Sequence, residues 1–223
     1  MRMRRKKNLE QRYDACADLL IEVNVNSLNL SELEECSEKF DALDEFGNDN
    51  PLYLEIGCGK GQFAIEMAKR HPDINFIAVE KTQNVIVTAV ENAIEAGVSN
   101  LRFIKCPAEY LSSFFAENSV DRLYLNFSCP YPKKKYAKHR LTHECFLSVY
   151  QKFLCPSAEI HIKTDNAGLF EFSINSLSGF GYTLKNVTFD LHNSDFEGNI
   201  VTEYEHRFSE MGCNIYRLEA YYK

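Results

Sequence analysis

The sequence predicts an α/β fold: a doubly wound, mostly parallel sheet with an antiparallel edge strand, preceded by an N-terminal extension. From residue 52 onward, short apolar runs alternate with helical stretches, as in sheets covered by helices on both faces. Near the C-terminus, the runs at 182–191 and 213–222 flank one helix and suit an antiparallel edge. We therefore expect the extension over residues 1–50 and one domain over residues 51–223.

The extension is expected to hold one helix around Leu9–Glu22, followed by a solvated acidic segment. Residues 31–51 carry eight acidic side chains and a single lysine, and they end in the turn residues GNDNP. Such a composition suggests a solvated lead-in to the domain.

The domain is expected to alternate strands and helices along the chain. The expected strands before the C-terminal pair are LYLEI (52–56), INFIAVE (74–80), LRFIKC (101–106), VDRLYLNF (120–127) and AEIHIKT (158–164). The expected helices are at 63–71, 82–96 with Thr82 as N-cap, 108–116, 142–153, 169–177 and within 200–212. Ligands of such sheets bind at the carboxyl ends of the strands, so the loops there are the candidate site.

Composition excludes several classes of protein. No apolar run approaches the ~20 residues that span a bilayer, and the charged start is not followed by the apolar segment of a secretion signal. The eight cysteines form no C-x-x-C pair, which predicts reduced thiols and no metal site. We expect a cytoplasmic protein without metal or membrane partner; whether it is a monomer or a homodimer is left open.

The net charge of -7 hides two basic runs. Residues 1–7 and residues 131–140 each hold five Lys or Arg and no acid, whereas the other 206 residues carry 15 basic and 32 acidic side chains. Either run alone could be a solvated tail or loop. Together, and with Tyr131 and Tyr136 interleaved in the second, they favour a nucleic-acid partner.

The turn after the first domain strand, LEIGCGKGQF, is rich in glycine. Gly57, Gly59 and Gly61 allow close approach of a ligand to the backbone and open a helix. Gln62 occupies the place of the third glycine in the dinucleotide fingerprint G-x-G-x-x-G, and the phosphate-binding pattern G-x-x-x-x-G-K-[ST] is not met either.

Two acidic residues narrow the choice of ligand. Glu55 lies two residues before the first glycine, where a carboxylate repels phosphate and attracts an ammonium group. Glu80 ends the second domain strand, where a carboxylate can accept hydrogen bonds from both ribose hydroxyls. A nucleoside with an ammonium group and no phosphate matches S-adenosylmethionine better than NAD. The alternative is that both are polar strand ends without a ligand.

Four motifs of the sequence resemble those of a known family: LEIGCGKGQF, NFSCPYPKKKYAKHRLTH, EIHIKTDNAGLFEFS and NIVTEYEHRFSEMGCNIYRLEA. They resemble the bacterial tRNA (guanine-N(7)-)-methyltransferase family, from the basic start nearly to the C-terminus. The resemblance implies a class I, Rossmann-like methyltransferase fold and the methyl donor S-adenosylmethionine. It also implies methylation of guanosine 46 in the variable loop of tRNA.

The resemblance also implies roles for individual residues. The implied donor-binding residues are Glu55, Gly57, Gly59, Gly61, Glu80, Pro107, Ala108 and Cys129. The implied substrate-binding residues are Lys133, Asp165, Thr202, Glu203, Tyr204 and Glu205. Residues expected to bind the RNA backbone are Lys134, Lys135, Lys138, Arg140, Arg4 and Arg5, since they belong to the two basic runs. Cys129 and Asp165 are the candidate catalytic residues.

Two positions depart from the family pattern. Pro107 stands in KCPA where the family usually has Asp in an N-G-D-A-like run, and Cys129 stands in C-P-Y where the family has a D-P-W-like motif. The second lost carboxylate is commonly regarded as catalytic in the family. A thiol is mostly protonated at neutral pH, so the site loses charge. The alternative function is therefore a weakened or inactive tRNA-binding homologue.

The remaining chemistry favours an active enzyme. Guanine N7 has a lone pair and no proton, so methylation needs alignment and charge stabilisation, not a general base. Asp165, Glu203 and Glu205 could accept hydrogen bonds from the donor edge of guanine. A covalent adduct on Cys129 is unnecessary for a nitrogen target. A small-molecule methyltransferase has no need of ten clustered cations, and an NAD-dependent oxidoreductase does not fit Gln62 or Glu55.

Overall fold

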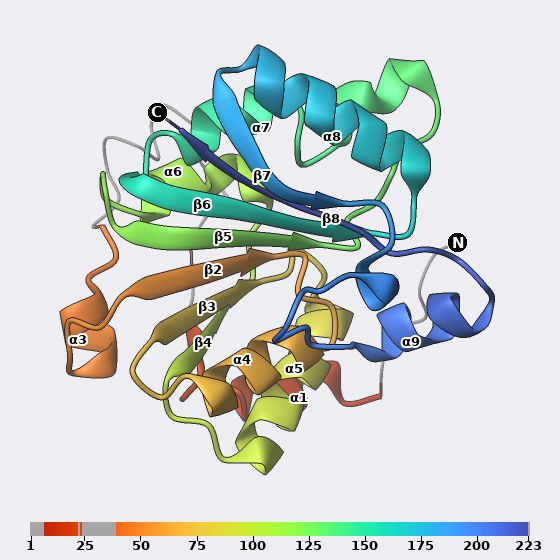
Figure 1. Cartoon of the computed structure of the whole chain (residues 1–223). Helices are drawn as coiled ribbons and strands as arrows, with labels where there is room; N and C mark the ends of the chain where they lie inside the picture. Colours follow the sequence, from red (N-terminus) through yellow and green to blue (C-terminus); the bar gives the residue numbers. More distant parts are fainter. Residues whose placement is uncertain (1–6, 22, 24–38, 223) are drawn as a thin grey trace.

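The protein, represented by a computed structural model, is described at residues 7–21, 23 and 39–222. Within those residues, eight strands form one sheet in the order β1-β4-β3-β2-β5-β6-β8-β7 (Figure 1). The strands are β1 (Leu20–Ile21), β2 (Leu52–Ile56), β3 (Asn75–Val79), β4 (Leu101–Ile104), β5 (Val120–Asn126), β6 (Leu154–Thr164), β7 (Tyr182–Thr188) and β8 (Tyr216–Tyr222). All neighbours up to β6 pair in parallel, which confirms the predicted sheet.

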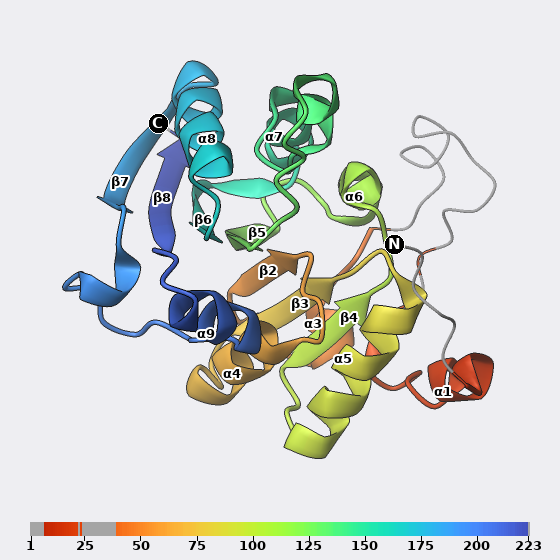
Figure 2. The same cartoon turned by 90° about the vertical axis from the view of Figure 1, so that its right-hand side faces the viewer.

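Helices cover both faces of the sheet (Figures 1 and 2). The helices are α1 (Leu9–Asp14), α3 (Ala42–Phe46), α4 (Gln62–Arg70), α5 (Gln83–Ala96), α6 (Leu111–Phe114), α7 (Glu144–Tyr150), α8 (Ala167–Gly179) and α9 (Glu203–Glu210). The short 3-10 helices are η1 (Ala108–Tyr110), η2 (Lys134–His139) and η3 (Leu191–Asn193). α1, α4 and α5 lie on one face and α6, α7 and α8 on the other. Each face buries its own apolar cluster. The cluster on the side of α1, α4 and α5 includes Phe103, and the cluster on the side of α6, α7 and α8 includes Leu123.

The N-terminal extension differs from the expected single long helix. α1 ends at Asp14, and Leu20–Ile21 instead pairs in parallel with β4 as the edge strand β1. The amide of Phe103 donates to the carbonyl of Leu19 (2.8 Å), and Leu20 is buried. The predicted helix is wrong after its first turns, because pairing with an open strand edge decides the conformation there. The described part of the extension thus packs on the domain.

The antiparallel strand predicted near the C-terminus is present, and its place has a consequence for the site. β8 lies between β6 and β7 and runs antiparallel to both, so the edge strand β7 runs parallel to β6. The connection over residues 189–215 therefore starts and ends at the edge of the sheet where β5 and β6 have their carboxyl ends. It carries α9 to that edge (Figure 1). No helix in the described part of the chain is long and apolar enough to cross a membrane.

Candidate active site

Two adjoining cavities lie at the carboxyl ends of the central strands. The inner cavity, of about 280 Å³, is lined by Ile56, Gly57, Val79, Glu80, Lys81, Cys106, Ala108, Glu109, Phe127, Ser128, Cys129, Tyr131, His139, Leu141 and Phe146. The α9 cavity, of about 480 Å³, is lined by Glu55, Gly57, Cys58, Gly59, Lys60, Gln62, Phe63, Asn126, Phe127, Thr202, Glu203, Tyr204 and Arg207. Gly57 and Phe127 belong to both, so the cavities meet at the end of β2. This is the edge of the sheet at which ligands of such folds bind.

The glycine-rich turn forms the boundary between the cavities. Gly57 has φ +84°, and a Cβ at this residue would meet no atom within 4 Å, so the glycine leaves space open for a ligand. Gly61 has φ +80°, and a Cβ there would lie 3.0 Å from the Cβ of Ala89. The first glycine thus keeps the site accessible, whereas the third lets α4 begin in close contact with α5.

Glu55 is the most unusual group of the site. The side chain is buried at the end of β2, and Asn126 donates to its Oε1 (3.0 Å). Oε2 is buried and has no hydrogen-bond partner among the described residues. Burial raises the pKa of Glu55 to about 7, against the opposing effects of Asn126 and Lys163. An unpaired buried carboxylate oxygen at a cavity fits a ligand with a positively charged hydrogen-bond donor.

The inner cavity is lined by three more of the predicted donor-binding residues, Glu80, Ala108 and Cys129, but not by Pro107. Glu80 follows β3 and accepts a hydrogen bond from the amide of Thr82 (2.9 Å), which orients its carboxylate at the cavity. Cys106 and Ala108 line the cavity, and the half-buried Pro107 between them caps η1. Burial raises the pKa of Cys106 to about 12, so this thiol stays neutral. Cys106 and Ala108 thus make an uncharged part of this wall, next to the carboxylate of Glu109.

The loop after β5 holds Cys129 between two strained residues. Phe127 has φ +50° and Tyr131 has φ +40°, a region that non-glycine residues seldom adopt. Arg140 supports this loop, since its Nε and Nη2 donate to the carbonyls of Pro130 and Tyr131 (both 3.0 Å). Such strain persists only where the surroundings enforce it, and it concentrates at functional sites. Arg140 therefore has a structural role in this loop, and its predicted contact with RNA phosphates stays a prediction.

Two predicted residues from distant parts of the chain, Asp165 and Tyr204, meet near Cys129. The ring of Tyr204 lies 4.9 Å from that of Phe127 and 4.4 Å from that of Phe208. Burial raises the pKa of the Tyr204 phenol, and the charge of Asp165 and the thiol of Cys129 raise it further. A hydrogen bond between Asp165 and the phenol is one of these effects, so Asp165 lies beside Tyr204. Tyr204 lines the α9 cavity and Cys129 lines the inner cavity.

The start of α9 docks on the glycine-rich turn. Thr202 caps the helix by accepting from the amide of Glu205 (3.1 Å). The amide of Glu203 donates to Oε1 of Gln62 (2.5 Å), and its carboxylate pairs with Lys60 (3.2 Å). Sequence reasoning missed Lys60 and Gln62, because both contacts join residues more than 140 positions apart.

Glu205 points away from the cavities. Its side chain is fully buried, and its oxygens accept from Lys163 (2.6 Å), His192 (2.8 Å) and Asn199 (2.7 Å). Burial alone would raise the pKa of Glu205, but the charge and the hydrogen bond of Lys163 lower it. The predicted contact between Glu205 and a guanine does not fit this placement, because a base at the mouth cannot reach the carboxylate. Glu205 anchors α9 instead.

An exposed basic ridge borders the inner cavity. It is made by the side chains of Lys133, Lys134, Lys135 and Lys138 in and before η2, which are all exposed. The ring of His139 lies 5.5 Å from that of Tyr131 and 6.1 Å from that of Tyr136, so aromatic groups accompany the lysines. Arg4 and Arg5, predicted to act with this ridge, lie outside the described residues.

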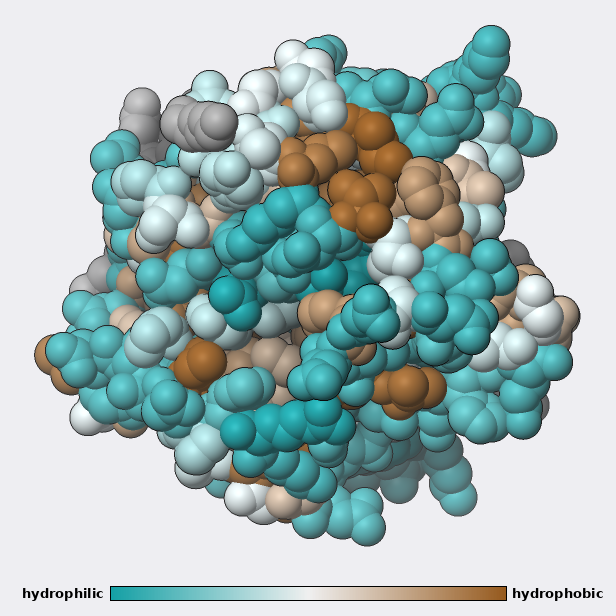
Figure 3. All heavy atoms as spheres, in the orientation of Figure 1, coloured by the Kyte–Doolittle hydropathy of each residue, from teal (hydrophilic) through white to brown (hydrophobic). Residues whose placement is uncertain are grey.

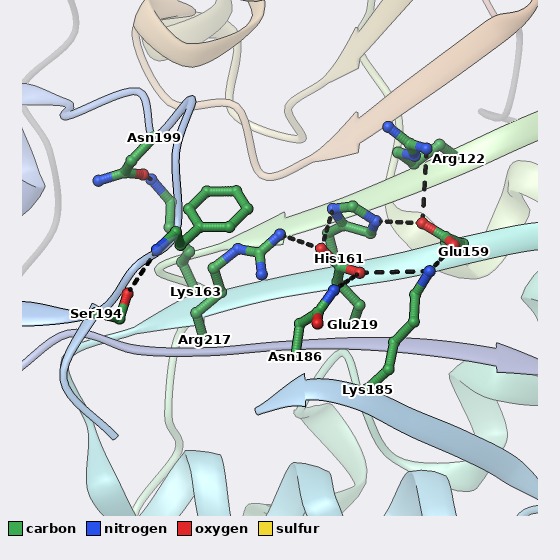
Figure 4. A network of polar contacts seen from close by, with 11 residues as sticks. Arg122, Glu159, His161, Lys163, Lys185, Asn186, Ser194, Asn199, Arg217 and Glu219 are labelled. Atoms are coloured by element: carbon green, nitrogen blue, oxygen red, sulfur yellow. Dashed lines mark hydrogen bonds and ion pairs between the residues drawn. The ribbon is translucent and has the colours of Figure 1, made fainter. Parts of the chain in front are cut away.

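A charged network covers the sheet face next to the α9 cavity (Figure 4). Glu159, His161 and Glu219 place possible metal ligands within 4.8 Å of one another. However, Lys185 pairs with both carboxylates and Arg217 pairs with Glu219. The carboxylate oxygens that a metal would need are thus already paired with cations, so the network is one of ion pairs. That the protein needs no metal stays a prediction.

In the space-filling view this part of the surface is hydrophilic, in contrast to the hydrophobic patch over the end of β7 and α8 (Figure 3).

This network should make the fold sensitive to acid. Burial lowers the pKa of His161 to about 4, with further lowering by Arg122 and Arg217. Unfolded chains bind a proton at histidine below about pH 6.5, so stability falls by up to about 1.4 kcal/mol per pH unit as the pH drops from 6.5 to 4. We expect His161→Asn to remove this component in urea unfolding at pH 6.5, 5.5 and 4.5. His206→Asn, at an exposed histidine of α9, is the control. Parallel pH profiles of the wild type and His161→Asn would contradict the assignment.

Comparison with known proteins identifies the family. A family model described as "Putative methyltransferase" matches residues 49–218. A tRNA (guanine-N(7)-)-methyltransferase of Bacillus cytotoxicus is 52% identical over 178 residues, which cover 80% of this chain and 82% of that protein. The protein of the same name from Halalkalibacterium halodurans is 52% identical over 178 residues, or 80% and 81% of the two chains. The chain belongs to the tRNA (guanine-N(7)-)-methyltransferase family.

Solved structures confirm the fold of this family member. The 16S rRNA methyltransferase KamB aligns with a TM-score of 0.60 at 15% identity, covering 84% of this chain and 96% of that one. A SAM-dependent methyltransferase from Aquifex aeolicus aligns with a TM-score of 0.55 at 15% identity, covering 87% and 98%. At such identities the likeness shows the Rossmann-like methyltransferase fold alone. The match to the family, over residues 49–218, includes every lining residue of both cavities.

Proposed function

We propose that this protein transfers the methyl group of S-adenosylmethionine to N7 of a guanosine in tRNA, at position 46 of the variable loop. The observation that carries the proposal is the unpaired buried oxygen of Glu55 beside a cluster of Asp165 and Tyr204, with an exposed lysine ridge at the same edge of the sheet. The relatives that share half of the sequence are named for this activity. A tRNA substrate also agrees with a cytoplasmic location.

The residues of the two cavities fit the methyl donor. The free Oε2 of Glu55 can accept a hydrogen bond from its ammonium group, and Gly57 leaves the space for it. Glu80 can bind the ribose hydroxyls, while Cys106 and Ala108 provide an uncharged wall for the base. When bound, S-adenosylmethionine supplies an electrophilic methyl group on a positively charged sulfur.

The cluster at the mouth fits the guanine. Asp165 can accept hydrogen bonds from the N–H groups of guanine, and its negative charge stabilises the positive charge that the ring gains as N7 is methylated. Tyr204 is 45% exposed, and its ring can pack on a base. Thr202 and Glu203 line the same cavity. N7 has a lone pair, so the residues have to orient the base and need not remove a proton.

The exposed residues around the site fit the rest of the tRNA. Lys133 and its three neighbours on the basic ridge can neutralise phosphates, and Tyr136 beside them is 40% exposed and can stack on a base. The basic start of the chain, including Arg4 and Arg5, would add phosphate contacts. We propose that the target guanosine is turned out of its stack to reach Asp165, since N7 must approach the donor in line.

The proposal is tested by incubating the protein with unmodified tRNA and radiolabelled S-adenosylmethionine and mapping the labelled base. We expect label on N7 of guanosine 46. Cys129→Asp should raise the rate about tenfold, because a carboxylate at the mouth adds charge stabilisation worth about 1.4 kcal/mol. Cys145→Asp, at an exposed cysteine of α7, is the matched control and should leave the rate unchanged.

Each of the remaining outcomes has its own meaning. Label on a different base would refute the guanine assignment. Label from Cys129→Asp alone, with tRNA bound equally by both proteins, would identify the natural chain as a weakened homologue. Binding of tRNA without label from either protein would identify a tRNA-binding protein that no longer transfers methyl groups.

A further inference from the structure

Lys163 is a buried lysine to which sequence reasoning gave no role. It lies on β6 two residues before Asp165, with a side chain that is 6% exposed. Its ammonium group donates to Oε2 of Glu205 (2.6 Å), the carbonyl of Ile200 (2.9 Å) and Oδ1 of Asn199 (3.0 Å). All three N–H bonds of the ammonium group are therefore used within the protein.

The three acceptors of Lys163 belong to one short segment, residues 199–205. Asn199 also donates to Glu205 (2.7 Å), and Glu205 donates its amide to the N-cap Thr202 (3.1 Å). In Figure 4 Lys163 and Asn199 lie at one end of the charged network. One buried cation thus determines the course of the segment that presents Thr202, Glu203 and Tyr204 to the α9 cavity.

Lys163 also acts on the donor side of the site. Its charge lowers the pKa of Glu55, which favours the ionised carboxylate. Asn126, which donates to Glu55, is the direct neighbour of Lys163 across β5 and β6. The ring of Phe127, which lines both cavities and contacts Tyr204, lies 5.6 Å from the ammonium group. Lys163 lines neither cavity, but its charge acts on Glu55 of the α9 cavity and its ammonium group lies near Phe127, which lines both.

Stability alone does not account for such an arrangement. Burying a lysine and a glutamate requires removing both charges from water, and an apolar pair of similar size is often at least as stable. What an ion pair with three directed hydrogen bonds adds is a unique geometry. Here the ion pair fixes the segment that carries the residues expected to bind guanine, and the charge of Lys163 acts on Glu55, which is expected to bind the donor.

We infer that Lys163 is a positioning residue that orders the guanine-binding start of α9 and supports the donor-binding carboxylate Glu55, so that the two halves of the site are coupled. The inference rests on the proposed function. Lys163 touches neither substrate: it acts on the base through Glu205 and on the donor through Glu55. Glu205, in contrast, acts only on the guanine-binding residues at the start of α9, which we call the guanine half of the site.

Variants of Lys163 and Glu205 should therefore differ in donor binding but not in the loss of kcat. We would measure binding of S-adenosylhomocysteine without tRNA by calorimetry, together with kcat and KM for tRNA. Lys163→Met should weaken binding of S-adenosylhomocysteine about tenfold and lower kcat about 100-fold. Glu205→Gln should lower kcat by a similar factor and leave S-adenosylhomocysteine binding within twofold of the wild type. KM for tRNA should stay within threefold in both, because the basic ridge is intact.

The two measurements test the two parts of this role separately. Unchanged S-adenosylhomocysteine binding in a folded Lys163→Met protein would overturn the coupling, and unchanged kcat would overturn the positioning. Thermal melting checks the fold. If Lys163→Met does not fold, Lys163→Arg keeps the charge with a different shape: it should bind S-adenosylhomocysteine like the wild type and lose kcat, and the reverse would refute the inference. Labelling of guanosine N7 by the wild type, run in parallel, tests the proposed function separately.

Discussion

Glu55→Gln is expected to weaken binding of S-adenosylmethionine by about 10- to 100-fold. The variant keeps the size of the side chain and can still accept from Asn126, but it removes the buried negative charge that would pair with the ammonium group of the donor. A hydrogen bond between charged groups contributes about 1.5–3 kcal/mol, and each 1.4 kcal/mol changes the dissociation constant tenfold. Calorimetry with S-adenosylhomocysteine, which carries the same ammonium group, measures this loss of affinity. Glu66→Gln, on the outer side of α4, is the control.

The same carboxylate predicts how donor affinity depends on pH. Burial raises the pKa of Glu55 to about 7, so the empty site is about half protonated near neutrality. The ammonium group pairs with the ionised form, and its binding must therefore displace a proton below pH 7. We expect donor affinity to rise as the pH increases from 6 to 8 and then to level off. In Glu55→Gln this rise should be absent; if it persists, another group controls binding.

Replacing the four lysines of the basic ridge with glutamine should reduce tRNA affinity by about two to three orders of magnitude at low salt. Each phosphate neutralised by a cation releases counterions and adds about 0.7–0.9 to the slope of log affinity against log salt. The variant of Lys133, Lys134, Lys135 and Lys138 should thus have a slope smaller by about 3. Filter binding at several salt concentrations measures both values. Lys69→Gln, on α4, should change neither, and an unchanged slope in the fourfold variant would show that RNA binds elsewhere.

Sequence patterns predicted the parts of the fold that depend on local signals. The strands from β2 onward are apolar runs between turn residues, and the glycine-rich turn follows β2 directly, so Glu55 and Gly57 could be placed together at the strand ends. β1 carries no such signal. Leu20 continues a helical pattern, and only the open edge of β4 makes it a strand. Contacts made by a distant part of the chain override a weak local preference there.

The candidate site shows the same limit. The resemblance brought Cys129, Asp165 and Tyr204 into one site, and the structure places them together. It could not indicate that Glu205 turns inward, because side-chain direction depends on where α9 begins and on Lys163, 42 positions earlier. Arg140 is a similar case: it belongs to a basic run, but its contacts with the strained loop after β5 depend on backbone carbonyls that no sequence pattern reveals.

The insertion of β8 between β6 and β7 has a consequence for how the site is assembled during synthesis. The donor half is built from residues 55–146, which leave the ribosome early, whereas the connection that carries α9 is held at both ends only when the final strand has paired with β6 from Tyr216 to Tyr221. Ribosomes release a chain from its N-terminus, and such long-range pairings form late. A nascent chain that lacks its last strand could therefore form the donor half while the guanine half, at the start of α9, is still unformed. Methyl transfer would begin only when the whole chain has been made.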